Sequence, residues 1–232
     1  SNSKWFIIGA VVVAIFIAAL VFFANPQQGD ELLTTVEDMV SRQDQDRFMD
    51  FFHRGQEFFL LDTEDHFLQA DREFQKVLAL KENDAATLAA LSRLYSVWAQ
   101  YYRDAKTDVQ TDAATKRVDT SAADKEIQNL NRKFEAKLKE SVQWTRQAQI
   151  YNPDLKEVLL ASADVARLNG DLEDARSILA RAEAIGIDEE TQYLSILIDM
   201  DKGSPPIQLA DKLEKALSAK SIIRAIYRIA RL

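Results

Sequence analysis

The chain has 232 residues, of which 47% are hydrophobic and 28% are charged, with no cysteine and a formal net charge of −8. The lack of cysteine excludes disulfides, thiolate metal sites and a cysteine nucleophile, and the negative charge argues against nucleic acid or an anionic membrane surface as the main partner. A composition rich in Ala, Leu, Glu, Gln, Asp and Lys favours helix over strand.

The amino-terminal segment contains an unbroken run of uncharged, mostly apolar residues from Trp5 to Ala24. At about 1.5 Å of rise per residue, this run would span roughly 30 Å, the hydrocarbon thickness of a bilayer. It is longer than the apolar part of a typical signal peptide, and its end, "FFA", places Phe22 where a cleavage site needs a small residue. We therefore expect an uncleaved transmembrane helix within residues 1–25, rather than a cleaved signal.

Flanking charge predicts the orientation of this anchor. Lys4 precedes the apolar run, whereas only acidic charges follow it until Arg42. By the positive-inside rule, residues 26–232 lie on the non-cytoplasmic side of the inner membrane, which in a bacterium is the periplasm. Small residues also recur every four positions along the run, and this spacing lets two membrane helices approach closely. These residues are Ala10, Ala14 and Ala18. Because alanine is common in any such span, we expect a plain single-pass anchor, with a homodimer through these three residues as the alternative.

Residues 26–47 follow as a linker and an amphipathic helix. The apolar residues of this helix recur at helical spacing on one face, and are Leu32, Leu33, Val36, Met39 and Val40. We expect the helix to cap the first of the repeats that follow it. Packing on the membrane surface or on a partner helix is the alternative, although acidic residues on its polar face disfavour anionic lipid.

A helical hairpin recurs from residue 48 onwards, and its clearest copy surrounds Asn169 and Gly170. These two residues separate two alanine-rich apolar runs, so that the glycine ends one helix. Asp171 follows at once, and its carboxylate is expected to accept a hydrogen bond from a free N–H in the first turn of the next helix.

Small and bulky residues recur four positions apart within these hairpins. Ala175 and Leu179 form one such pair, and Ala70 and Phe74 form another upstream. In this spacing the chain resembles the tetratricopeptide repeat (TPR), a helix–turn–helix unit of about 34 residues. The resemblance implies an all-α fold, in which the transmembrane helix is followed by a solenoid of about four helical hairpins over residues 48–232. Each hairpin of such a solenoid buries its apolar sites only by stacking on its neighbours.

A polar stretch interrupts the pattern at about residues 104–124. It contains almost no bulky apolar residue, and such a composition cannot bury a core, so we expect a loop or a mobile helix there. From Lys125 the apolar periodicity returns and predicts one long amphipathic helix up to Pro153. The stretch is therefore an insertion between the two helices of one repeat, either a binding loop or a neutral spacer.

The TPR resemblance also implies a concave groove lined by the first helices of the repeats. Relatives that clamp a peptide carboxylate use Lys, Asn and Arg at set groove sites, whereas this chain has Ala89, Ala90, Leu160 and Ala161 there, so that activity is not implied. A mixed apolar and charged groove suits an extended or helical protein segment. The residues that the resemblance places in the groove, as exposed partner-binding side chains, are Phe52, Gln56, Phe59, Arg93, Ser96, Val97, Leu160, Asp164, Arg167, Leu194 and Ile198.

No pattern typical of catalysis is present. The chain has two histidines, His53 and His66, and lacks the HExxH, GxSxG and glycine-rich phosphate-loop motifs. The segment from Asp62 to His66 lacks the spacing and the glycine of a calcium loop, which favours a solvated turn. We therefore predict no catalytic residue, no cofactor and no metal site.

The sequence as a whole favours a non-enzymatic scaffold or adaptor that is tethered to the membrane and supports an envelope protein complex. TPR relatives with this layout assist assembly of secretion, motility, cytochrome or outer-membrane machinery. Two alternatives stay open. One is a holdase-type chaperone for exported clients, and the other is a structural subunit whose repeats are buried permanently in one assembly.

Overall fold

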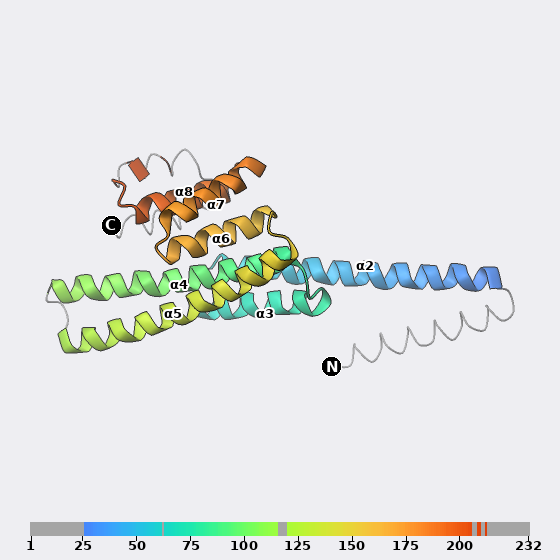
Figure 1. Cartoon of the computed structure of the whole chain (residues 1–232). Helices are drawn as coiled ribbons and strands as arrows, with labels where there is room; N and C mark the ends of the chain where they lie inside the picture. Colours follow the sequence, from blue (N-terminus) through green and yellow to red (C-terminus); the bar gives the residue numbers. More distant parts are fainter. Residues whose placement is uncertain (1–25, 62, 116–119, 206–207, 210–211, 213–232) are drawn as a thin grey trace. The chain divides into compact units, whose positions relative to one another are not determined.

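The computed structural model describes residues 26–61, 63–115, 120–205, 208–209 and 212. These residues are all-helical and contain no strand, which confirms the predicted fold class at that level (Figure 1). The helices are α2 (Pro26–Phe59), α3 (Glu64–Leu80), α4 (Ala85–Ala114), α5 (Thr120–Tyr151), α6 (Lys156–Leu168), α7 (Leu172–Ile185) and α8 (Glu189–Asp201).

The predicted transmembrane helix at residues 5–24 lies outside the described residues. Among the residues that the structure does describe, no helix is both long enough and apolar enough to cross a membrane.

The chain divides into two compact units, residues 1–53 and residues 54–232. In the first unit, the described part of α2 is mostly exposed from Ser41 to Asp50, and the rings of Phe48 and Phe52 stack with centroids 6.3 Å apart. Because α2 is continuous from Pro26 to Phe59, the expected capping helix at 26–47 and the expected first repeat helix are one element. The side chains of residues 32–40 lie outside the described part.

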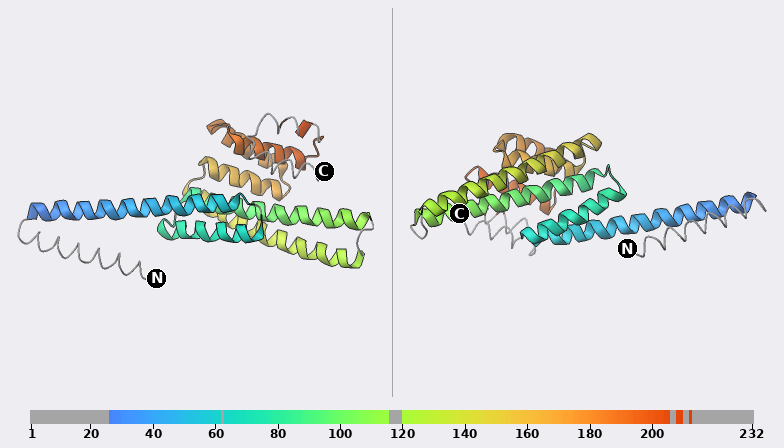
Figure 2. Two further views of the ribbon diagram at one scale, coloured as in Figure 1. Left: turned by 180° about the vertical axis from the view of Figure 1, so that it is seen from behind. Right: turned by 90° about the horizontal axis from the view of Figure 1, so that it is seen from below.

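In the second unit, each helix from α3 to α8 packs against the next one along the chain, and α4, α6 and α8 also form a row. The successive pairs run from α3–α4 to α7–α8, and α6 packs against both α4 and α8. Figures 1 and 2 show α6 between α4 and α8, and a long antiparallel hairpin formed by α4 and α5.

The core of this unit is built from the small and bulky residues that the repeat pattern singles out. Ala70, Phe74, Ala175 and Leu179 are each fully buried, at 0% exposure. Ala175 and Leu179 of α7 pack in one apolar cluster with residues of α6 and α8. At the end of α2, a Cβ placed on Gly55 would lie 2.7 Å from Cε1 of Phe74, so only glycine allows this approach of α2 to α3.

Glycine ends α6 as expected. Gly170 has a φ of 90°, and the α6 carboxyl end closes with hydrogen bonds from Gly170 N to Arg167 O (3.0 Å) and from Asp171 N to Ala166 O (2.9 Å). This is the Schellman pattern. The helix α8 ends in the same way at Gly203, whose φ is 81°.

The prediction that the Asp171 side chain caps α7 is wrong. Asp171 does occupy the N-cap position of α7, but its side chain makes no capping hydrogen bond. The reason is its backbone, which has φ −83° and ψ 64° where it closes the turn after α6, rather than the extended conformation of a capping residue. Side-chain caps begin α4 and α8 instead, at Asp84 and Asp188.

The polar stretch at 104–124 is helical where the structure describes it. The helix α4 runs on to Ala114 and α5 begins at Thr120. Ala, Gln and Lys in this stretch are good helix formers, and Ala123 is only 3% exposed. The hydroxyls of Thr107 and Thr111 each donate to the carbonyl four residues earlier, which satisfies them on the helix itself.

Candidate functional site

The structure brings together the helices on which most of the predicted groove residues lie. Arg93, Ser96 and Val97 are on α4, a second group is on α6, and the last two are on α8, so that the three predicted first helices are neighbours. Five of the residues are exposed or half-buried: Phe52, Gln56, Phe59, Arg93 and Val97. Phe52 belongs to the first compact unit and the other four to the second.

The expectation of exposed side chains is wrong for the other six groove residues. All are buried in the isolated chain: Ser96 (0% exposed), Leu160 (1%), Asp164 (6%), Arg167 (2%), Leu194 (5%) and Ile198 (0%). The apolar three, Leu160, Leu194 and Ile198, lie in the cluster that joins α6, α7 and α8. They are core residues because these short helices pack closely enough to cover the sites that the repeat register assigns to a groove.

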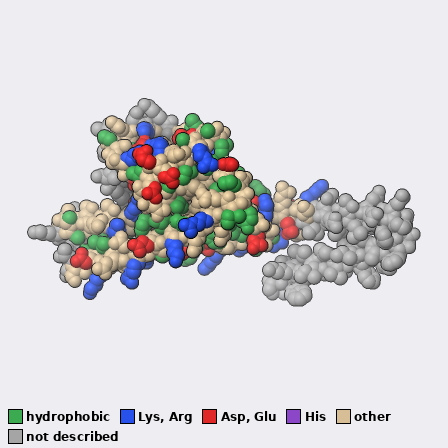
Figure 3. All heavy atoms as spheres, in the orientation of Figure 1, with side chains coloured by type: hydrophobic (Ala, Val, Ile, Leu, Met, Phe, Trp, Pro, Cys, Tyr) green, Lys and Arg blue, Asp and Glu red, His purple; other side chains and the backbone are tan. Residues whose placement is uncertain are grey.

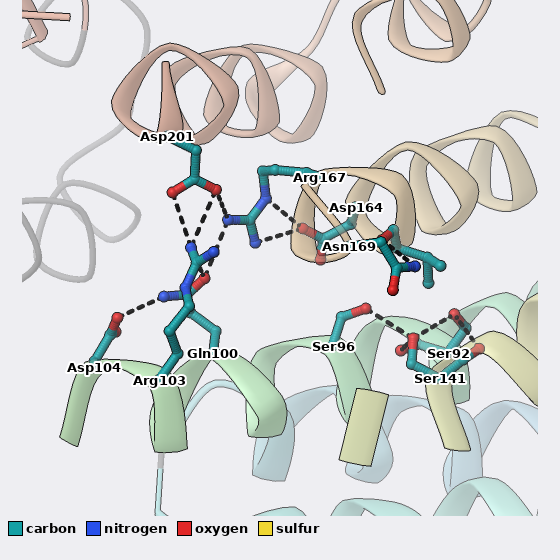
Figure 4. A network of polar contacts seen from close by, with 11 residues as sticks. Ser92, Ser96, Gln100, Arg103, Asp104, Ser141, Asp164, Arg167, Asn169 and Asp201 are labelled. Carbon is teal, nitrogen blue, oxygen red and sulfur yellow. Dashed lines mark hydrogen bonds and ion pairs between the residues drawn. The ribbon is translucent and has the colours of Figure 1, made fainter. Parts of the chain in front are cut away.

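Ser96 is buried where α4 crosses α5. Its Oγ lies 2.8 Å from Oγ of Ser141. One turn earlier, Ser92 Oγ donates to the Ser141 carbonyl (3.1 Å), and Ser141 Oγ donates to the Ser92 carbonyl (2.8 Å). Small hydroxyl side chains therefore let the two backbones approach and satisfy each other's polar groups (Figure 4).

Arg167 is buried by polar partners on three helices. Its Nε and Nη2 donate to Oδ1 of Asp164 on the same helix, at 2.9 and 2.7 Å. Its Nη1 donates to Oδ2 of Asp201 on α8 (2.8 Å) and to Oε1 of Gln100 on α4 (3.1 Å). The guanidinium thus links α6 to α4 and to α8 (Figure 4).

Two further arginines extend this arrangement. Nη2 of Arg103 donates to the two carboxylate oxygens of Asp201, at 2.9 and 3.1 Å, and to Oε1 of Gln100 at 2.6 Å. Nη1 of Arg93 lies 2.8 Å from Oε2 of Glu190 on α8. We refer to the whole set as the charge network, which comprises Arg93, Gln100, Arg103, Asp104, Asp164, Arg167, Glu190 and Asp201.

The network shifts the pKa values of its two central arginines in opposite directions. Burial by itself would lower the pKa of Arg167, but the carboxylates of Asp164 and Asp201 outweigh it and raise that pKa. For Arg103, burial and the neighbouring guanidinium of Arg167 together lower the pKa, against the opposing effect of Asp201. Arg103 is thus the less well compensated of the two, and both stay charged at neutral pH.

This arrangement can hold helices together and recognise charge, but it contains no nucleophile with a neighbouring base. Both histidines lie elsewhere, on α2 and α3, where Nδ1 of His66 is 2.6 Å from Oγ1 of Thr63 at the start of α3. Within the described residues, no three His, Asp or Glu side chains are placed to bind a metal ion. On the face seen in Figure 3, acidic and basic side chains are interspersed over the described helices.

Sequence reasoning found three of the eight residues of the charge network and missed the other five. It singled out Arg93, Asp164 and Arg167, although as exposed groove residues. It missed Gln100, Arg103, Asp104, Glu190 and Asp201, because the contacts that join the helices connect residues remote in sequence: Arg103 and Asp201 are separated by 98 positions. The one available signal was a basic residue, Arg103, on α4 and an acidic residue, Asp201, at the end of α8.

Comparisons with known proteins add no family assignment, because no protein-family model, curated protein or solved structure matches this chain.

Proposed function

We propose that this protein is a non-enzymatic scaffold or adaptor that binds other proteins and supports the assembly or stability of an envelope complex. In this proposal residues 5–24 anchor it as a single pass in the inner membrane, and the described helices belong to a TPR-like solenoid of about four hairpins on the periplasmic side. Ala10, Ala14 and Ala18 would pair two copies in the membrane.

The observation that carries the proposal is the order in which the helices pack. The helices α4, α6 and α8 lie side by side, with α5 and α7 packed as their partners, as expected of stacked hairpins. Two of these helices, α6 and α8, are both 13 residues long and end in the same glycine turn. A stack of this kind offers extended surfaces to other proteins.

The accessible part of the predicted binding surface is smaller than the sequence implied. Arg93, Val97, Gln56 and Phe59 can reach a partner directly in the second unit, since each is exposed or half-buried. The buried members of the groove set act by shaping the surface rather than by touching a partner.

The permanent-subunit alternative is favoured by one observation at the turns that join α5 to α6 and α7 to α8. These turns are linked by an ion pair between Lys156 Nζ and Asp188 Oδ2, at 2.6 Å. Large apolar residues are exposed at both: Ile150 (76%), Tyr151 (49%), Ile185 (56%) and Ile187 (69%). An apolar patch that is exposed at neighbouring turns is typical of an interface, and the ion pair brings these two turns close together.

Capture of the full chain from detergent-solubilised native membranes tests the proposal. A small, stoichiometric partner set supports the scaffold, a permanent complex without free protein supports the subunit, and a varied client set supports the chaperone. Absence of any partner after crosslinking contradicts all three. The Ile187→Ser variant should weaken capture if the turns are an interface, with Leu61→Ser as the matched control because Leu61 is comparably exposed (53%) at another turn.

A further inference from the structure

Two ion pairs bridge helices that are separated by a third. The helix α6 packs between α4 and α8, yet Arg93 of α4 reaches Glu190 of α8 (2.8 Å), and Arg103 of α4 reaches Asp201 of α8 (2.9 Å). We refer to these two ion pairs as the α4–α8 straps. Arg93 precedes Arg103 on α4, and Glu190 precedes Asp201 on α8. The two straps therefore cross α6 one after the other along its length.

Both straps pass over the same face of α6. Arg167 of α6 donates to Asp201 of the second strap (2.8 Å). Asp164 lies one turn earlier on α6. Burial by itself would lower the pKa of Arg93 in the first strap, but the carboxylate of Glu190 and, after it, that of Asp164 raise this pKa. The face beneath the straps is closed, since Asp164 is 6% and Arg167 is 2% exposed. This is the face to which the TPR resemblance assigns the partner groove.

The straps themselves are far more accessible than the ion pair that they cover. The side chains of Arg93 and Glu190 are 22% and 52% exposed, and those of Arg103 and Asp201 are 27% and 22% exposed. The Arg167–Asp164 side chains beneath are 1% and 9% exposed. Accessible ion pairs contribute little and are screened by salt, whereas buried ones are costly to break. The straps can therefore exchange while the Arg167–Asp164 pair stays intact. Nη1 of Arg167 then loses Asp201 and keeps Oε1 of Gln100 as its acceptor.

The two ends of the straps differ in how firmly they are held. Among the described helices, α4 packs against α3, α5 and α6, whereas α8 packs against α6 and α7, and Asp199 of α8 also pairs with Lys212. Release of the straps would thus leave Arg93 and Arg103 on the helix with more packed neighbours, and Glu190 and Asp201 on the helix with fewer. The fixed arginines are then the charges that need replacement partners, and carboxylates supply them.

We propose that the α4–α8 straps hold this face in a closed, autoinhibited state, and that a partner segment rich in carboxylates opens it by taking over Arg93 and Arg103. The partner assignment rests on the proposed scaffold function, whereas the closure is a property of the chain alone. The partner's acidic groups replace Glu190 and Asp201, which regain water as α8 moves away.

The distance between α4 and α8 tests the closure directly. Because the chain has no cysteine, spin labels on Thr107→Cys and Lys202→Cys, both exposed, report this distance in the full chain in detergent. A pair on Thr107→Cys and Glu126→Cys is the control within the α4–α5 hairpin. The strap variant combines Glu190→Gln with Arg103→Gln, and Arg103→Lys restores the charge of the second strap.

In the unaltered chain at low salt we expect one narrow, short distance. A longer distance should appear in the strap variant and at about 1 M salt, where the screening length falls to about 3 Å. Each strap should change the open population by up to about fivefold, the Arg103→Lys chain should resemble the unaltered one, and the control pair should not change. An unchanged distance in both the variant and high salt overturns the closure, whatever partners are captured.

The acidic nature of the partner is tested with poly-glutamate as the probe and poly-lysine as its opposite, at equal ionic strength. Poly-glutamate should lengthen the α4–α8 distance in the unaltered chain, and should bind several-fold less to an Arg93→Gln/Arg103→Gln chain. Opening by poly-lysine, or by neither peptide, overturns the assignment of an acidic partner while the salt and variant results still decide the closure.

Discussion

Replacing Arg167 by Met should destabilise the protein strongly, although the residue was expected from sequence to be exposed. The change keeps a long side chain but removes four hydrogen bonds, to Asp164, Asp201 and Gln100. Asp164, with a side chain only 9% exposed, would be left as a buried carboxylate without its cation. Breaking a buried ion pair on one side costs about 3–5 kcal/mol, mostly for the charge that stays behind.

A second variant separates the buried charge from other effects. Combining Arg167→Met with Asp164→Leu removes both members of the buried pair and fills their space with apolar atoms. Replacing a buried pair by packed apolar residues is often neutral or stabilising, so the double variant should recover most of the loss. Asp201 keeps Arg103 as its partner in this chain.

Urea unfolding of the full chain in detergent, followed by circular dichroism, measures these free energies. Arg93→Met is the matched control, because Arg93 belongs to a solvent-accessible pair and should lose at most about 1 kcal/mol. A loss below about 0.5 kcal/mol for Arg167→Met, which is typical of an exposed site, would refute the burial of Arg167 and the role of the charge network. A double variant as unstable as the single one would refute the uncompensated carboxylate as the cause.

Three other outcomes follow from the structure and the sequence. Gly55→Ala should cost about 1–3 kcal/mol by overpacking, because its Cβ would meet the Phe74 ring at 2.7 Å, whereas Gly186→Ala, with its nearest atom 3.8 Å away, should be neutral in the same urea assay. For Asp84, burial raises the pKa, but hydrogen bonds from Lys81 and Thr87 lower it overall. The contribution of Asp84 to the free energy of unfolding is thus present above the unfolded pKa of about 3.9 and lost as the pH falls through the lower folded value. Asp84→Asn should therefore reduce the fall of stability at acidic pH. An unchanged fall, measured by unfolding curves at a series of pH values, would contradict this role of Asp84. Finally, residues 5–24 should keep the protein in the membrane pellet after carbonate washing; release at full mass would exclude the anchor.

The elements of the fold were predictable because the signals for them are local. Gly170 ends a helix through its own backbone conformation, and Ala175 and Leu179 occupy a buried face because of their spacing within one helix. The prediction of an Asp171 cap was wrong for an equally local reason. The tight turn at Gly170 fixes the backbone of Asp171 in a conformation in which its side chain makes no capping hydrogen bond. Helix type and buried faces thus follow from a few neighbouring residues.

The groove was not predictable in this way. A repeat register says on which side of a helix a residue lies, but not whether side chains from neighbouring helices close over that side. Leu160 and Arg167 share the predicted face of α6, and they are covered by different means: Leu160 by the apolar cluster with α7 and α8, and Arg167 by polar groups of α4 and α8. Such coverage depends on partners remote in the sequence, since Gln100 and Asp201 lie 67 and 34 positions from Arg167.

The charge network also explains how α8 finds its place. Apolar contacts such as those of Leu194 and Ile198 tolerate repacking, so they alone would let α8 slide along α6. A slide by one helical turn, about 5.4 Å, would take Asp201 away from both Arg103 and Arg167, which it now contacts at 2.9 and 2.8 Å. Because Arg167 would then lack one of its two carboxylates while still buried, the misplaced stack is penalised far more than the apolar core requires. The apolar residues drive the helices together, and the charges select the one alignment in which every buried ion has its partner.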